Sequence, residues 1–250
     1  MLKFASVIMS VVVACACIPA AVMAIGATLK GANVEDLAKS IELGRSVPPG
    51  YLNSFEQSHD LYALGKLCAD TVSRATITVA VEVWKAARNT QDTALKTATL
   101  GQAIQIVDQR LQCAATDANA WLLRSMLALD ANEPAALVLS ALRMSYRLGP
   151  NESWIALPRQ RFATQFYEVG GFELAKEFES ELSTIVATYK AKDVAKLYAD
   201  SRGNVRAALQ RFIALQSESR QLEVVLAINN LGVSMKGLPE ILDASSKKLF

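Results

Sequence analysis

The stretch ANAWLLRSMLALDANEPAALVLSALRMSYRLGP, residues 118–150, decides the fold. Its first half places apolar side chains at helical spacing on one face: Trp121, Leu122, Met126 and Leu129. The polar run 130–133 then favours a turn, and Pro134 suits the first position of a second helix, where its missing N–H is not needed. Pro150 prevents this second helix from continuing. The stretch therefore predicts two short antiparallel helices.

The same stretch resembles a tetratricopeptide repeat (TPR), a helix-turn-helix unit of about 34 residues. The resemblance is carried by Trp121, by the small residues Ser125 and Ser145, and by the closing Pro150, whereas Val138 replaces the usual alanine of the second helix. It implies an all-α fold in which TPR-like helical hairpins stack as an α-solenoid or bundle. Since one hairpin cannot bury its apolar face, roughly three stacked units are the expected minimum.

Neighbouring segments extend the pattern in both directions. Before the hairpin, four residues match the small, large, small and closing positions of a preceding unit, although Arg110 is large and Ala115 is not proline: Ala103, Val107, Arg110 and Ala115. Trp84, Trp121 and Trp154 recur at intervals close to the repeat length. The alternative is a non-repetitive helical bundle with three buried tryptophans.

The composition agrees with one helical domain behind a leader. The chain has 250 residues, 52% of them hydrophobic, with only 12 glycines and 7 prolines. Lys and Arg number 26 against 24 Asp and Glu, which gives a net charge of +2. A general nucleic-acid-binding protein needs a concentrated basic surface, so we expect no nucleic acid as a partner.

The N-terminus, residues 1–30, reads as a signal peptide or a transmembrane anchor. An uncharged run extends from Phe4 to Leu29 and is long enough to cross a bilayer as a helix. A basic start at Lys3 and the small-residue site Val22-Met23-Ala24 also fit a cleaved secretory signal. In a bacterial cell both alternatives export the remainder, which would be anchored in the inner membrane facing the periplasm, or periplasmic or secreted after cleavage.

The rest of the chain divides into three parts. Residues 31–50 form a linker with a short amphipathic helix inside it, ended by Pro48-Pro49-Gly50. The TPR-like helical domain is expected over 51–235, and residues 236–250 form a C-terminal tail.

Further helices are expected within the domain. Helical spacing predicts elements over 52–67, 95–114, 172–190, 194–198 and 205–228. The segment 76–83 also shows the alternation of a strand, but a lone strand would leave its backbone groups unpaired, so we expect a helix there as well.

Catalytic signals are sparse. His59 is the single histidine, and no nucleophile elbow, phosphate-binding glycine loop or metal-ligand cluster accompanies it. Glu177 and Glu181 lie one turn apart, but the neighbouring Lys176 favours a solvated helix face. We therefore expect a protein that is not an enzyme and has neither metal nor cofactor; the alternative is a glycan-cleaving enzyme that uses paired carboxylates.

Two cysteines lie outside the leader, Cys68 and Cys113. An oxidising compartment would allow a disulfide between them, and the two belong to neighbouring helices of the expected stack. The alternative is a pair of buried thiols that act as small apolar side chains.

Arginines are densest around the central hairpin: Arg124, Arg143, Arg147, Arg159 and Arg161. Arg143 and Arg147 are one helical turn apart, and their planar guanidinium groups match carboxylates and phosphates. They form a candidate binding groove for an anionic polysaccharide or an acidic partner. The alternative is local ion pairing, with Asp130, Glu133, Glu152 and Glu168 as the acidic neighbours.

The segment SYRLGPNESWI, residues 145–155, together with Arg159 and Arg161, is similar to small exported or membrane-anchored accessory proteins of bacterial polysaccharide systems. The resemblance implies an accessory role in polymer assembly or export. Combined with the repeat pattern, it predicts a non-catalytic scaffold of the cell envelope that binds protein partners, with membrane contact through residues 4–29 if the leader is uncleaved. A structural envelope protein is a further alternative.

Overall fold

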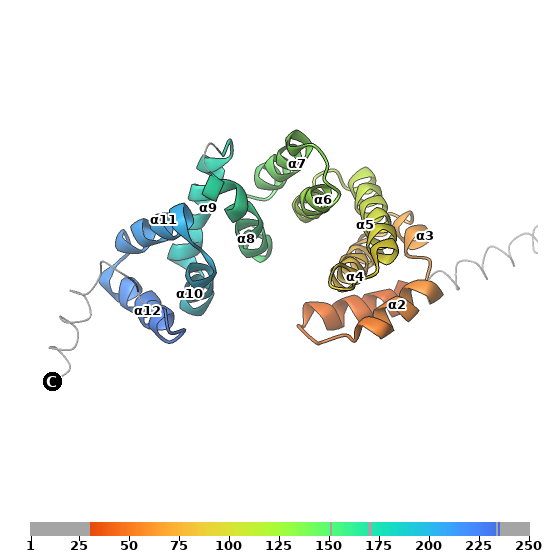
Figure 1. The fold of residues 1–250 in the computed structure, drawn as a ribbon, viewed down its shortest axis with the longest axis horizontal. Coiled ribbons are helices and arrows are strands. Elements are labelled where there is room, and N and C mark those ends of the chain that lie inside the picture. The colour runs from red at the N-terminus through yellow and green to blue at the C-terminus, as the bar shows by residue number, and fades with distance from the viewer. Residues whose placement is uncertain (1–30, 151, 170–171, 234, 236–250) are drawn as a thin grey trace, which may run out of the picture. The chain divides into compact units, whose positions relative to one another are not determined.

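The structure is a computed structural model that describes residues 31–150, 152–169, 172–233 and 235. Within these residues the chain is all-helical, without a strand, as predicted (Figure 1). The leader and the C-terminal tail lie outside the described residues. The described chain forms two compact units, an N-terminal unit that ends at Ala141 and a C-terminal unit that begins at Leu142, where a single domain over 51–235 was expected.

The N-terminal unit begins with helical residues 31–42. The named helices that follow are α2 (Pro49–Ser58), α3 (Leu61–Gly65), α4 (Asp70–Arg88), α5 (Thr93–Cys113), α6 (Ala118–Asp130) and the first half of α7 (Ala135–Leu148). In this unit α4 packs against α2, α3 and α5, and α5 packs against α6. Asp60, Asp92 and Asp117 cap α3, α5 and α6, each accepting a hydrogen bond from a backbone N–H of the first turn.

The segment 31–50, which was expected to be a linker, contributes side chains to the core of this unit. The amphipathic helix expected inside it is present, but its apolar residues Val34, Leu37 and Ala38 are buried in the same hydrophobic core as Leu52, Phe55 and Val79. The apolar face of so short a helix gains stability only by packing, and α2 and α4 provide the surface.

The ambiguous segment 76–83 is helical and lies inside α4, as predicted. Both alternating sets of side chains are buried, among them Ile77, Val79, Ala80 and Val83. A helix surrounded by others buries more than one face, and this broad burial is what produced the strand-like alternation in the sequence.

The central hairpin is present as α6 and α7, with two features that the sequence did not indicate. Pro134 precedes α7 instead of opening it, and its carbonyl accepts the first hydrogen bonds of the helix from Leu137 and Val138. Asn132 adopts a left-handed backbone conformation, with φ of 54°, which asparagine tolerates better than most residues. The buried Ser125 hydroxyl donates to the carbonyl of Val138 at 2.7 Å and joins the two helices.

The C-terminal unit contains the end of α7 and five further helices. They are α8 (Ser153–Val169), α9 (Ala175–Thr188), α10 (Ala191–Asp200), α11 (Gly203–Ala214) and α12 (Glu218–Asn229). Here α8, α9 and α11 pack against one another, and α12 packs against α10 and α11. Pro158 lies inside α8, which continues through it.

The single helix expected over 205–228 was wrong, because α11 ends at Ala214 and α12 begins at Glu218. Ser217 caps the new helix by accepting a hydrogen bond from the N–H of Arg220. At the other end of α11, the Glu168 carboxylate accepts from the backbone N–H groups of Asn204 and Val205 at 3.0 and 3.1 Å. A carboxylate at a helix N-terminus is favoured by the helix dipole, so Glu168 ties α8 to α11.

Candidate functional site

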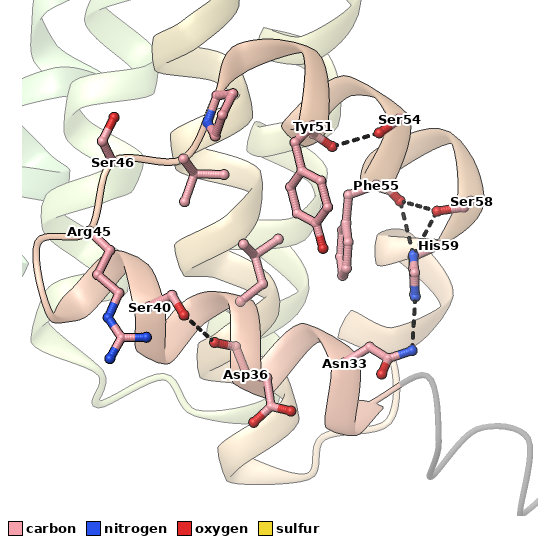
Figure 2. A pocket seen from close by; sticks show the side chains of 13 residues that line it. Asn33, Asp36, Ser40, Arg45, Ser46, Tyr51, Ser54, Phe55, Ser58 and His59 are labelled. Carbon is pink, nitrogen blue, oxygen red and sulfur yellow. Dashed lines mark hydrogen bonds between the residues drawn. The ribbon is translucent and has the colours of Figure 1, made fainter.

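An open groove lies between residues 31–42 and α2 in the N-terminal unit (Figure 2). We call it the α2 groove; its volume is about 960 Å³. It is lined by Asn33, Asp36, Leu37, Ser40, Arg45, Ser46, Val47, Pro48, Tyr51, Ser54, Phe55, Ser58 and His59. Most of these side chains are polar, and several of them are exposed to solvent.

One wall of the α2 groove is aromatic. Tyr51 and Phe55 lie one turn apart on α2, and His59 follows as the C-cap residue of the helix, with its ring against that of Phe55 (Figure 2). The Phe55 and His59 rings stack with their centroids 4.0 Å apart, and the Tyr51 ring centroid lies 6.0 Å from that of Phe55. Phe55 is buried, whereas Tyr51 remains 52% exposed, so an apolar ring stays in contact with water at the groove.

The hydrogen bonds of His59 indicate its tautomer. Nδ1 lies 3.0 Å from the carbonyl oxygen of Phe55. Because a carbonyl oxygen can only accept, this contact is a hydrogen bond in the tautomer that carries its proton on Nδ1. Nε2 faces the amide nitrogen of Asn33 at 3.5 Å and acts as the acceptor there. Ser58 Oγ lies 2.9 Å from Nδ1, but a protonated nitrogen cannot remove a proton from it. This serine–histidine contact is therefore not a nucleophile with its base.

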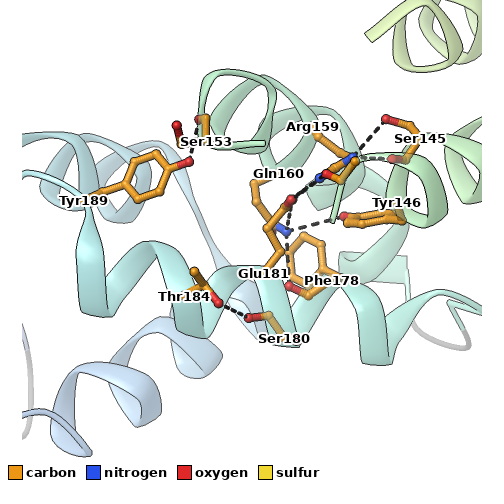
Figure 3. Close-up of polar contacts among 11 residues, drawn as sticks. Ser145, Tyr146, Ser153, Arg159, Gln160, Phe178, Ser180, Glu181, Thr184 and Tyr189 are labelled. Carbon is orange, nitrogen blue, oxygen red and sulfur yellow. Dashed lines mark hydrogen bonds and ion pairs between the residues drawn. The ribbon is translucent and has the colours of Figure 1, made fainter. Parts of the chain in front are cut away.

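The C-terminal unit contains a buried ion pair between Arg159 of α8 and Glu181 of α9 (Figure 3). Arg159 Nε lies 3.1 and 3.2 Å from the two carboxylate oxygens, and Nη2 also donates to Glu181. The guanidinium group further donates to the carbonyls of Ser145 and Gly149, at 2.6 and 2.8 Å. Arg159 is fully buried and Glu181 is 6% exposed.

Two more buried side chains complete this cluster. Gln160 Nε2 donates to Glu181 Oε2 at 2.9 Å and to the carbonyl of Phe178 at 3.1 Å. The Tyr146 ring lies beneath the guanidinium group, 4.5 Å from its central carbon. Burial raises the pKa of the Tyr146 phenol well above its ordinary value, and the negative charge of Glu181 raises it further, so this hydroxyl keeps its proton.

Glu181 is not on a solvated helix face, contrary to the expectation from its spacing. Glu177 is exposed, and both carboxylates line a cavity of about 300 Å³ together with Tyr146, Pro150, Lys176, Ser180 and Thr184. A pair of catalytic carboxylates needs one member that can hold a proton and donate it. Both oxygens of Glu181 already accept hydrogen bonds from Arg159 or Gln160, so this carboxylate is engaged inside the protein and is poorly placed for that role.

The five candidate arginines do not share one environment. Arg159 is buried and so unavailable to a polymer, and Arg124 is bound by Asp108 at 2.8 Å and Glu133 at 3.0 Å. Arg143 pairs with Glu173 at 2.6 Å on the surface. Arg147 and Arg161 are exposed. Of the acidic neighbours expected from the sequence, Glu133 is used by Arg124, and Asp130 pairs instead with Arg88.

Cys68 and Cys113 are joined by a disulfide, with their Cα atoms 5.4 Å apart. The bond links the residues just before α4 to the end of α5. Arg110 lies one turn before Cys113 and reinforces the same corner, with Nη2 2.7 Å from Asp70 and Nε 2.8 Å from Asp117. Arg110 is buried at the position where a TPR-like unit would have a small residue.

The α2 groove was not predicted from the sequence, in which His59 was noted only as a single histidine without an accompanying catalytic motif. The signal available was the spacing of Tyr51, Phe55 and His59, but its meaning depends on residues 31–42 packing opposite α2. No group of His, Cys, Asp and Glu among the described residues is arranged to hold a metal ion. None of the described helices combines the length and the apolar character needed to cross a bilayer.

Comparison with known proteins gives no relative: no family model, no curated protein and no solved structure matches the chain.

Proposed function

We propose that the chain is a non-catalytic binding scaffold of the bacterial cell envelope, accessory to polysaccharide assembly or export. The observation that carries this proposal is that the polar groups suited to catalysis are already engaged within the protein, whereas the α2 groove is open. The buried carboxylate Glu181 is neutralised by Arg159, and the serine–histidine contact of Ser58 and His59 lacks a free base. The α2 groove, by contrast, is open and is lined by hydrogen-bonding and aromatic side chains. These features suit binding better than acid–base or nucleophilic chemistry.

Stacked TPR-like hairpins are part of the same proposal. The α6–α7 hairpin supports it, because the small Ser125 allows close contact with α7 and donates to Val138. The tryptophan spacing does not support it, since Trp84 is buried whereas Trp154 is 59% exposed. Because Trp154 is exposed, the alternative of a helical bundle with three buried tryptophans is not supported either.

An exported location is supported by the disulfide and by the leader sequence. Disulfides persist in oxidising compartments such as the bacterial periplasm and are rare in the cytosol. The bond between Cys68 and Cys113 is consistent with such a compartment.

Site-specific photocrosslinking in the native cell envelope tests for the protein partner. The probe amino acid would replace Leu137, Trp154 or Leu215, which are 53%, 59% and 75% exposed apolar residues that a partner could cover. Exposed Lys192 on α10 serves as the control position. We expect at least one apolar position to give a discrete protein adduct that the control lacks. Identical, diffuse labelling at all four positions would contradict the proposal.

A further inference from the structure

We propose that the α2 groove binds an uncharged, hydroxyl-rich segment of a glycan. This inference rests on the proposed function and adds to it a site and a ligand class. It differs from the anionic polymer suggested by the arginine-rich sequence, because the residues that line the groove have another chemistry.

Several polar groups of the lining can accept hydrogen bonds. Ser40, Ser54 and Ser58 lie near carbonyls of their own helices, at 2.9 to 3.1 Å, and each hydroxyl can donate its single proton there. Their oxygens retain lone pairs that can accept from a ligand. The Asp36 carboxylate adds acceptors, and so does the side-chain oxygen of Asn33, whose amide nitrogen faces His59. A ligand that supplies many O–H donors fits this arrangement.

The charges of the lining favour a neutral ligand. The described lining residues include one carboxylate, that of Asp36, and one guanidinium group, that of Arg45. Their charges cancel, and both side chains are exposed. An acidic polymer would bring its own carboxylates close to Asp36 and would gain only one cation in return. The groove thus lacks the cluster of cations that polyanion binding requires.

The aromatic wall provides the other half of a sugar site. A pyranose ring has an apolar face of C–H groups and an edge of hydroxyls. The exposed ring of Tyr51 can cover such a face, while the serines and Asp36 lie within the same groove to accept from the edge (Figure 2). An extended alanine peptide has no ring face for Tyr51 to cover, so it would leave the aromatic wall unmatched.

The test is binding of the full-length chain, in detergent, to an array of neutral and acidic glycans. Hits are quantified by calorimetry with a neutral hexasaccharide, with a hexagalacturonate and with a capped alanine tetrapeptide. We expect binding to a neutral glycan and none to the last two. Tyr51→Ala should weaken it about 3- to 10-fold, the range expected for one aromatic contact, whereas Tyr51→Phe should bind as the wild type does.

Tyr62→Ala is the matched control, since Tyr62 is also an exposed tyrosine but does not line the groove. Circular dichroism verifies that each variant is folded. The inference would be overturned by equal affinities of Tyr51→Ala and Tyr62→Ala, by preference for hexagalacturonate or peptide, or by absence of neutral glycan binding. Because photocrosslinking reports only protein partners, a negative glycan result together with a specific protein adduct would reject this inference alone.

Discussion

The two units bury charge in opposite ways. In the N-terminal unit the buried Arg110 reaches from the protein interior to Asp70, a carboxylate that is 63% exposed, and to Asp117. In the C-terminal unit both partners of the central pair are withdrawn from water, with side-chain exposures of 0% for Arg159 and 5% for Glu181. The first arrangement keeps one charge hydrated, and the second removes both from water.

This difference teaches how each unit obtains its stability. Burial of two charges costs desolvation that the ion pair offsets only with good geometry and additional hydrogen bonds. Arg159 makes additional hydrogen bonds to the carbonyls of Ser145 and Gly149, and Glu181 accepts an additional one from Gln160. Both units bury apolar side chains, and the N-terminal unit adds a covalent link at its corner.

The largest effect is expected from breaking the buried pair. Glu181→Ala leaves the Arg159 charge buried without its partner, and we expect a loss of about 3–5 kcal/mol in the free energy of unfolding of the C-terminal unit. Urea unfolding followed by circular dichroism measures it. The double variant Arg159→Met with Glu181→Leu should recover most of the loss, since no charge remains buried. A double variant as unstable as the single one would show that the polar contacts themselves are needed.

The next effect concerns the covalent link of the N-terminal unit. Replacement of both Cys68 and Cys113 by serine should lower the free energy of unfolding by about 2–4 kcal/mol, because the unfolded chain loses a constraint. Dithiothreitol should destabilise the wild type similarly and leave the double variant unchanged. Alkylation without prior reduction, mapped by mass spectrometry, checks the bond directly; label at both positions in the exported protein would refute it.

A smaller effect follows from the titration of Asp70. The hydrogen bond from Arg110 is the main cause that lowers the pKa of Asp70 below its ordinary value of 3.8, with the nearby Arg74 charge contributing less. A lowered folded-state pKa stabilises the fold fully above the ordinary value, and the contribution is lost as pH falls through the lowered one. The stability difference between wild type and Asp70→Asn should therefore be constant near neutral pH and shrink below pH 3.8. Carboxyl titration by NMR should show a larger pKa increase in Arg110→Ala than in Arg74→Ala.

The smallest effect is expected at the surface pair of Arg143 and Glu173. Their side chains are 50% and 64% exposed, so solvent screens the attraction. Arg143→Ala should change the free energy of unfolding by about 0–1 kcal/mol, measured by the same urea unfolding. A loss comparable to that of Glu181→Ala would mean that exposure is a poor guide to the energetic role of charged pairs in this protein.

The positions of the helices could be predicted better than the roles of their polar residues. Apolar periodicity located α5, α6 and α7, since burial of one face is a local property of the sequence. The break between α11 and α12 was missed although Ser217 is a recognisable cap, because the apolar pattern continues across it.

The buried ion pair and the α2 groove could not be predicted, because both depend on contacts between helices that sequence spacing does not reveal. Arg159 appeared as a surface cation and Glu181 as part of a solvated face, yet they neutralise each other from different helices. The α2 groove likewise requires residues 31–42 to pack beside α2. The binding role proposed for its wall of Tyr51, Phe55 and His59 depends on that tertiary arrangement.

The most direct test is crosslinking in the native envelope, followed by recovery of the tagged chain. It asks whether the protein binds a partner and whether the buried pair of Arg159 and Glu181 has only a structural role. The measurement compares wild type with the folded double variant Arg159→Met and Glu181→Leu. The account predicts that both recover the same protein partner in equal amounts, because the pair only holds α8 and α9 together. Loss of the partner from a fully folded double variant, or recovery of no partner by the wild type, would contradict it.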